Sequence, residues 1–274
     1  MGAEVPGMEA KMRGKVQVAL DGMELHAISE SIIPQGVDEG NITVNVTQTG
    51  KGAGYGQRVT GVEDRTRDVT VRFVLKCRDT EERAEVLDAI NRWAVGEHDM
   101  TVSYRPGKKL RVLCVTPINV QYVGKWTSEY KIGFRAIEIP YWEDRWPVTA
   151  AETASAGTDT EISIINSGSV EACLQLRAVL TGAATGLKVI SEGQTIEITG
   201  ITGAASGDII VIDYDARGIQ RIARITTNET VSLLGKRTEG SHDDIVLAPG
   251  AHTVTVKVTG AGADVTAMIR RRWM

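Results

Sequence analysis

The sequence is poor in the residues that usually carry metal binding, cross-linking or catalysis. It has three cysteines and four histidines in 274 residues. The cysteines, Cys77, Cys114 and Cys173, are odd in number and none belongs to a CxxC pair, which argues against a zinc site and a disulfide framework. Free thiols are the expectation, and a single Cys77–Cys114 bridge is the alternative.

Long apolar runs are missing as well. No segment approaches the roughly 18 apolar residues that a membrane-spanning helix needs. The N-terminus has no apolar core of the kind that a secretory signal carries. We therefore expect no membrane insertion and synthesis in a reducing cytoplasm.

An excess of positive charge is also absent. The formal net charge is −4, with 31 Lys and Arg against 35 Asp and Glu, and neither half of the chain is basic. A basic face is the usual electrostatic mark of a nucleic-acid binder, so specific binding to DNA or RNA is not expected. The run at 270–272 is three arginines in an alternating tail, which is more typical of a solvated or interface strand.

Helix is scarce, and one segment predicts it. Apolar residues recur at helical spacing in 79–95, with Asp79 as N-cap, Glu82 as its reciprocal capping partner and Gly96 as the stop. Alternating strands are predicted on both sides of this helix, at 69–76 and 126–137. One amphipathic helix beside a sheet with one apolar face predicts that the helix covers that face.

The rest of the chain reads as strands, so the fold class is mostly β. We expect an α+β domain at 1–146 containing the helix, and a linker at 147–160 that is rich in Ala, Thr, Ser and Gly. Nine short strands separated by turn residues follow in 161–274, which indicates a β-sandwich or jelly roll.

A glycine-rich stretch is the main candidate for a functional loop. It lies within 48–67, a segment that the sequence predicts to be a long polar loop. Its spacing fits neither phosphate-binding glycine motif, so a flexible loop is the better interpretation, and in an assembly this loop could become ordered against a neighbour. The candidate interface residues are Gly50, Lys51, Gly52, Gly54, Tyr55 and Gly56. Edge strands within 15–47 are expected to take part.

No catalytic, metal or cofactor site is predicted. The segment His242-Asp243-Asp244 lies on one loop and lacks converging ligands. The stretch 213–218 resembles the start of a calcium loop, but Arg217 and Arg224 occupy ligand positions. Glu143 and Asp144 are adjacent in sequence and so are not placed to face each other across a substrate.

The ordered set of motifs resembles the siphophage distal tail proteins, which form the hub of the phage tail. The motifs are VTVRFVLK at 69–76, DTEE at 79–82, YRPGK at 104–108, IPYW at 139–142, NSGS at 166–169, GDIIVID at 207–213, LAPGAHTVTV at 247–256 and RRRW at 270–273. They span nearly the whole chain and are weakest over residues 1–68.

This resemblance implies a tail-tube-like β-sandwich with one helix at 1–146, which forms a ring, and a galectin-like β-sandwich at 161–274. It implies a structural protein of the virion tail tip or baseplate, assembled in the host cytoplasm and not an enzyme. The implied partners are five further copies in a hexamer, the tail tube protein, a tail-tip protein and receptor-binding proteins. DNA would pass through the ring without specific binding.

Two alternatives come from other classes of protein. The first is a carbohydrate-binding module at 160–274 for host adhesion, whose aromatic candidates would be Tyr214 and Trp273. The second is a glycoside hydrolase on a sandwich fold, which needs two carboxylates facing one cleft at roughly 5–10 Å.

Overall fold

A computed structural model describes residues 16–50, 57–122, 127–214 and 220–274. The chain divides into two compact units, Met1–Trp142 and Glu143–Met274. The protein is mostly β, as the sequence predicts, with a single α-helix among the described residues.

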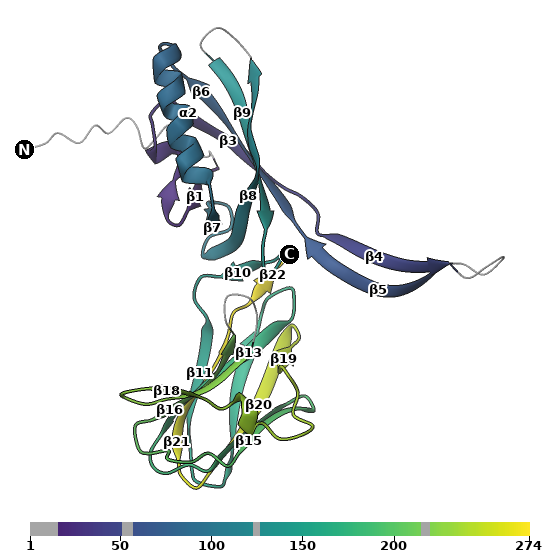
Figure 1. Ribbon diagram of the computed structural model, residues 1–274, viewed down its shortest axis with the longest axis vertical. Helices are drawn as coiled ribbons and strands as arrows, with labels where there is room; N and C mark the ends of the chain where they lie inside the picture. Colours follow the sequence, from purple (N-terminus) through teal and green to yellow (C-terminus); the bar gives the residue numbers. More distant parts are fainter. Residues whose placement is uncertain (1–15, 51–56, 123–126, 215–219) are drawn as a thin grey trace, which may run out of the picture. The chain divides into compact units, whose positions relative to one another are not determined.

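The first unit is built on one antiparallel sheet with strand order β2-β1-β7-β8-β9-β6-β3. Its elements are β1 (Val18–Leu20), β2 (Met23–Glu24), the short 3-10 helix η1 (Leu25–Ala27), β3 (Ile32–Glu39), β6 (Asp68–Lys76), α2 (Thr80–Ala94), β7 (Glu97–Val102), β8 (Lys108–Tyr122) and β9 (Thr127–Ala136). Helix α2 lies on one face of the sheet (Figure 1). The helix therefore forms the layer that covers this face, in a mostly β unit with one helix.

The core of the first unit forms because alternating residues of β6 and β9 point to the helix side. Phe73 pairs with Tyr130 across the two strands, and their rings stack at 5.5 Å. Trp93 from α2 meets Phe134 edge-on, with ring centroids 6.4 Å apart. All four side chains are buried, so the apolar stripe of the helix covers the apolar face of the sheet, as predicted.

The helix begins where the sequence predicts, but half of its capping box is different. Asp79 accepts a hydrogen bond from the backbone N–H of Glu82 at 2.8 Å. Glu82 does not return the bond to Asp79. Its carboxylate accepts from the backbone N–H of Arg78 at 2.7 Å and from the hydroxyl of Ser31 at 2.6 Å. Glu82 thereby fixes the start of the helix to the turn before β3.

A long hairpin forms a separate two-stranded sheet. It consists of β4 (Thr43–Gly50) and β5 (Gln57–Thr66), which pair with each other from Thr43 and Thr66 to Gly50 and Gln57 (Figure 1). The prediction of a loop over 48–67 was wrong, because the segment includes the end of strand β4 and all ten residues of strand β5. Polar and glycine residues hide the strand from pattern analysis, since neither face shows a clear apolar alternation.

The second unit is a β-sandwich. One sheet has the order β11-β21-β13-β16-β17-β18, with β19 paired to β13, and the other has the order β12-β20-β14-β15. Residues from both sheets form one buried core. The strands are β11 (Val148–Ala154), β12 (Asp159–Asn166), β13 (Ala172–Leu180), β14 (Gly186–Ser191), β15 (Gln194–Thr199), β16 (Ile209–Tyr214), β17 (Gln220–Ile225), β18 (Thr230–Ser232), β19 (Val246–Leu247), β20 (Gly250–Thr259), β21 (Ala263–Ile269) and β22 (Arg272–Trp273); β10 (Trp142–Asp144) lies at the unit boundary, and the 3-10 helix η2 is Leu234–Lys236.

The segment predicted as a linker, 147–160, forms strand β11 and the start of β12. Strand β11 pairs with β21 over seven residues, from Val148 opposite Ile269 to Ala154 opposite Ala263. Most of its side chains are small or polar and exposed, so composition alone indicates a flexible segment. Backbone pairing with β21 holds the strand in place, and Val148, Ala150 and Ala154 pack in or against the core of the sandwich.

Candidate assembly interface

One of the six candidate interface residues, Gly50, lies at the end of the β4–β5 hairpin. Gly50 is the last residue of β4 and pairs with Gln57. The other five candidates, Lys51, Gly52, Gly54, Tyr55 and Gly56, lie outside the described residues. The predicted loop segment therefore includes the end of β4 and the whole of β5, which the sequence analysis did not recognise as a strand.

Of the strands within 15–47, β1 lies inside the main sheet, between β2 and β7, and the others have an unpaired edge among the described residues. In the main sheet, β2 and β3 are the two outer strands of the path, while β4 belongs to the hairpin. Strand β3 carries Pro34, which has no N–H to donate, and a register shift follows between Pro34 and Gly36. Strand β2 has only two residues. Both outer strands are therefore poor templates for another chain.

Each strand of the hairpin has an unpaired edge among the described residues, and neither strand contains proline. Strands β4 and β5 contain eight and ten residues, and within the described part of the chain they pair only with each other. An edge strand presents a row of free N–H and C=O groups that can pair with another chain. The geometry thus favours the hairpin over the sheet edges as a surface for strand pairing.

A partly buried polar cluster lies where the hairpin leaves the sheet. We call this group, Glu39, Arg67, Tyr104, Arg105 and Trp142, the root cluster. Glu39 ends β3, and Arg67 connects β5 to β6. One Glu39 oxygen accepts from the Tyr104 hydroxyl at 2.7 Å and Arg105 Nε at 2.9 Å. The other accepts from Arg105 Nη2 at 2.9 Å and Trp142 Nε1 at 3.0 Å.

The root cluster perturbs the ionisation of its members. Burial acts to raise the pKa of Glu39, but hydrogen bonds from Arg105, Tyr104 and Trp142 outweigh it, and the pKa lies below its usual value. Burial and then the bond to Glu39 raise the pKa of Tyr104. Burial lowers the pKa of Arg67, and the charge of Glu39 offsets part of that effect. The cluster is thus a fixed charge assembly at the base of the hairpin.

Sequence reasoning missed this cluster because it missed β3. Pro34 and the irregularity before Gly36 break the alternation of apolar residues in 32–39, so no strand was predicted there. The motif at 104–108 and Trp142 did appear in the family resemblance. Nothing in the sequence around Glu39 indicates that its carboxylate accepts four hydrogen bonds from Tyr104, Arg105 and Trp142.

The other titratable candidates are tied into separate local networks. His98 contacts Asp21 at 2.7 Å and the carbonyl of Val95 at 2.9 Å. Asp213 pairs with Arg221, and Asp243 with Arg237. The backbone N–H of Thr195 donates to His242 at 3.1 Å. These groups are spread over both units.

Glu143 and Asp144 pair with the arginine run instead of with each other. Arg271 and Trp273 both donate to the carboxylate of Asp144, and Arg272 donates to Glu143 at 3.4 Å. The arginines of the C-terminal run are therefore bound within their own unit. This arrangement agrees with an interface or structural strand and does not offer a free phosphate clamp.

Three further observations concern metal, thiol and membrane chemistry. Within the described ranges, no three His, Cys, Asp or Glu side chains are grouped so that they could hold a metal ion. Cys77, Cys114 and Cys173 are free thiols, and burial raises the pKa of each. Among the helices of the described segments, none has the length and apolar character to cross a membrane.

Comparison with solved structures identifies the fold. The chain matches the crystal structure of the SPP1 Dit protein, described as a paradigm of the hub adsorption apparatus in phages that infect Gram-positive bacteria, with a TM-score of 0.73 and 14% identity. The match covers 94% of this chain and 99% of that one. The protein therefore has the fold of SPP1 Dit across both units.

The remaining comparisons with known structures and sequences give weaker matches or none. A chain of the phage P2 baseplate in its activated conformation matches with a TM-score of 0.45 and 10% identity, over 93% of this chain and 98% of that one. No protein-family model matches the sequence, and no curated protein matches it significantly.

Proposed function

We propose that this chain is a structural tail-hub component of a phage or prophage virion, and that it acts by assembly without catalysing a reaction. The observation that carries the proposal is the end-to-end likeness to SPP1 Dit, a hub protein, over 94% of this chain and 99% of that one. Because a fold alone does not fix function, the free edges of the β4–β5 hairpin supply the second, independent support.

The proposed assembly is a closed, hexameric ring formed by 1–146. Ring closure requires a head-to-tail interface that repeats around an axis. The hairpin of one copy is suited to this role because it offers long unpaired edges to the next copy. Gly50, together with Lys51, Gly52, Gly54, Tyr55 and Gly56 at the tip, is the proposed leading part of that contact.

The proposed partners follow from a position at the tail tip. The ring would join the tail tube protein to a tail-tip protein, allow DNA to pass through its lumen, and carry receptor-binding proteins on the second unit. The second unit, with its sandwich of two sheets, is the proposed galectin-like domain. None of these roles requires a cofactor.

Light scattering coupled to size-exclusion chromatography tests the proposal. We expect the 29.6 kDa chain to appear as a hexamer, either alone at high concentration or with the tail tube or tip protein present. Negative-stain images of that fraction should show rings with six-fold symmetry. A chain that stays monomeric at high concentration, and also with both partner proteins, would contradict the proposed function.

Carbohydrate binding by the second unit is the competing proposal. Its two sequence candidates, Tyr214 and Trp273, are both only partly exposed. Trp146 is 78% exposed and is the better candidate for an aromatic platform. A glycan array compared between wild type and Trp146→Ala decides the matter: hits lost in the variant favour sugar binding, and an array without hits removes it.

A further inference from the structure

Arg67 in the root cluster is a buried cation whose hydrogen-bonding capacity the described residues of its unit fill only in part. The residue is 5% exposed. Its Nε and Nη1 atoms are buried, and no group of the described residues lies within hydrogen-bonding distance and geometry of them. Native proteins bond nearly all of their buried polar groups, so two unbonded nitrogens on one buried guanidinium need a specific explanation.

Glu39 cannot supply the missing bonds. It is the nearest carboxylate, and its Oε2 atom lies 3.7 Å from Arg67 Nη1, beyond hydrogen-bonding distance. Each Glu39 oxygen already accepts two bonds, from Tyr104 and Arg105 on one side and from Arg105 and Trp142 on the other. The root cluster therefore holds two arginines for one carboxylate and has one positive charge in excess.

Arg67 lies at the junction between the hairpin and the main sheet, where a movement of the hairpin would expose its guanidinium to a new partner. Arg67 connects β5 to β6, between the last residue pair of the hairpin, Thr43 with Thr66, and the first pairs of the main sheet. Because β4 and β5 pair only with each other among the residues described, a shift of the hairpin at its root breaks no ladder bond of the main sheet. Such a shift can give another group access to the guanidinium.

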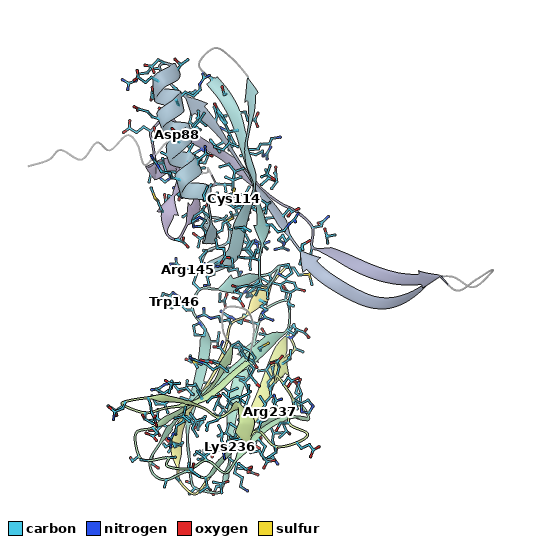
Figure 2. The ribbon with its side chains drawn as sticks, viewed as in Figure 1. Asp88, Cys114, Arg145, Trp146, Lys236 and Arg237 are labelled. Atoms are coloured by element: carbon cyan, nitrogen blue, oxygen red, sulfur yellow. The ribbon has the colours of Figure 1, made fainter. Side chains whose placement is uncertain are left out.

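We propose that Arg67 is a docking cation, which binds a carboxylate of a second copy of this chain when the hairpin pairs with that copy. This inference rests on the proposed ring. A carboxylate suits the site because it neutralises the excess charge and accepts the donors of a guanidinium in a planar, bidentate geometry. The second copy offers exposed carboxylates, such as Glu85 and Asp88 on the outer face of α2 (Figure 2).

The inference predicts that replacing Arg67 weakens assembly without lowering the thermal stability of the free protein. For an arginine with a purely structural role, we would expect both to decrease together. Replacing a buried, poorly paired ion by an apolar group of similar volume is often neutral or stabilising. In Arg67→Met, Glu39 keeps all four of its bonds, so the free protein should melt at the wild-type temperature or above it. The same substitution should raise the concentration needed for half-assembly by about tenfold or more, because a charge-assisted contact is lost.

The experiment compares three variants by thermal melting and by light scattering across a concentration series. Arg67→Met should lose assembly and keep its Tm. Arg135→Met is the control, because Arg135 is exposed and bonded to Asp68, and it should change neither property much. Arg105→Met removes the main partner of Glu39 and should lower the Tm.

The outcomes distinguish this inference from the proposed function. If Arg67→Met lowers the Tm as much as Arg105→Met does, or assembles like the wild type, Arg67 is not a docking cation while the ring stands. A wild-type chain that never assembles overturns the ring and the inference with it. In a structure of the assembled ring, a carboxylate oxygen of the neighbouring copy should lie about 3 Å from the Arg67 guanidinium; a guanidinium still unbonded there contradicts the inference.

Discussion

Glu39 and Asn166 are polar side chains, largely or fully buried, whose bonding capacity is filled by neighbours in their own unit. Asn166 is 1% exposed, and its amide nitrogen donates to the carbonyls of Val170 and Leu247 at 3.1 and 2.9 Å. Its oxygen accepts from the N–H of Gly168 at 3.0 Å. Burying such a group lowers the stability of the fold only slightly while all of its hydrogen bonds are made. A substitution that removes one bonding partner leaves a buried polar atom unbonded and lowers the stability much more.

Glu39→Gln should destabilise the protein in a manner that depends on pH. The substitution leaves Arg67 and Arg105 without a carboxylate partner, so we expect the free energy of unfolding to fall by about 3 kcal/mol at neutral pH. Because the folded-state pKa of Glu39 is lowered, its charge contributes stability above the unfolded-state pKa, and that contribution is lost as pH falls through the folded-state pKa. Urea unfolding at pH 7 and at successively lower pH should show the difference between wild type and variant shrinking with acid.

Asn166→Asp should destabilise the second unit by about 3 kcal/mol. The substitution replaces an N–H donor by an oxygen that faces two carbonyls in a buried site. The control is Asn228→Asp on an exposed turn, which should change stability by less than about 0.5 kcal/mol. Equal effects of the two variants in urea unfolding would show that the bonds of Asn166 contribute little.

At the scale of elements, sequence pattern succeeded where side chains alternate or recur clearly. Strand β6, helix α2 and most strands of the second unit were predicted, because each places apolar residues on one face. Strands β3, β5 and β11 were missed for different reasons. In β3 a proline and an irregularity break the period, β5 is polar and belongs to a separate hairpin, and β11 is made largely of small residues.

The candidate site was predictable only in part. The glycine-rich stretch marked the right place along the chain, since Gly50 ends β4. The root cluster could not be predicted, because Glu39 meets Arg105 and Trp142 across 66 and 103 residues of sequence. Contacts at that separation depend on the register of β3 against β6, and sequence pattern did not supply that register.

Removing the hairpin should separate assembly from folding. Residues 44–65 pair only among themselves within the described ranges, so replacing them by a two-residue glycine turn should change the stability of the first unit by less than about 1 kcal/mol. Thermal melting measures this effect. Light scattering should show that the shortened chain no longer forms rings, and ring formation without the hairpin would place the interface elsewhere.

At the scale of the whole molecule, the two units differ in how they bury apolar surface. The first covers one sheet with one helix, and the second packs two sheets face to face around a core of its own. A unit with its own core can fold without the remainder of the chain. The boundary between Trp142 and Glu143 therefore defines a natural place to cut.

The fragment 143–274 should fold alone, and the fragment 161–274 should not fold equally well. The shorter fragment starts at the domain boundary expected from composition, and it lacks β11, which pairs with β21 over seven residues. Without β11, strand β21 becomes an exposed edge, which promotes aggregation. Circular dichroism and thermal melting should show a cooperative β protein for 143–274, whereas 161–274 should melt lower or aggregate. Equal stability of the two fragments would mean that β11 is the linker its composition suggests, since its pairing would then contribute nothing that the sandwich needs.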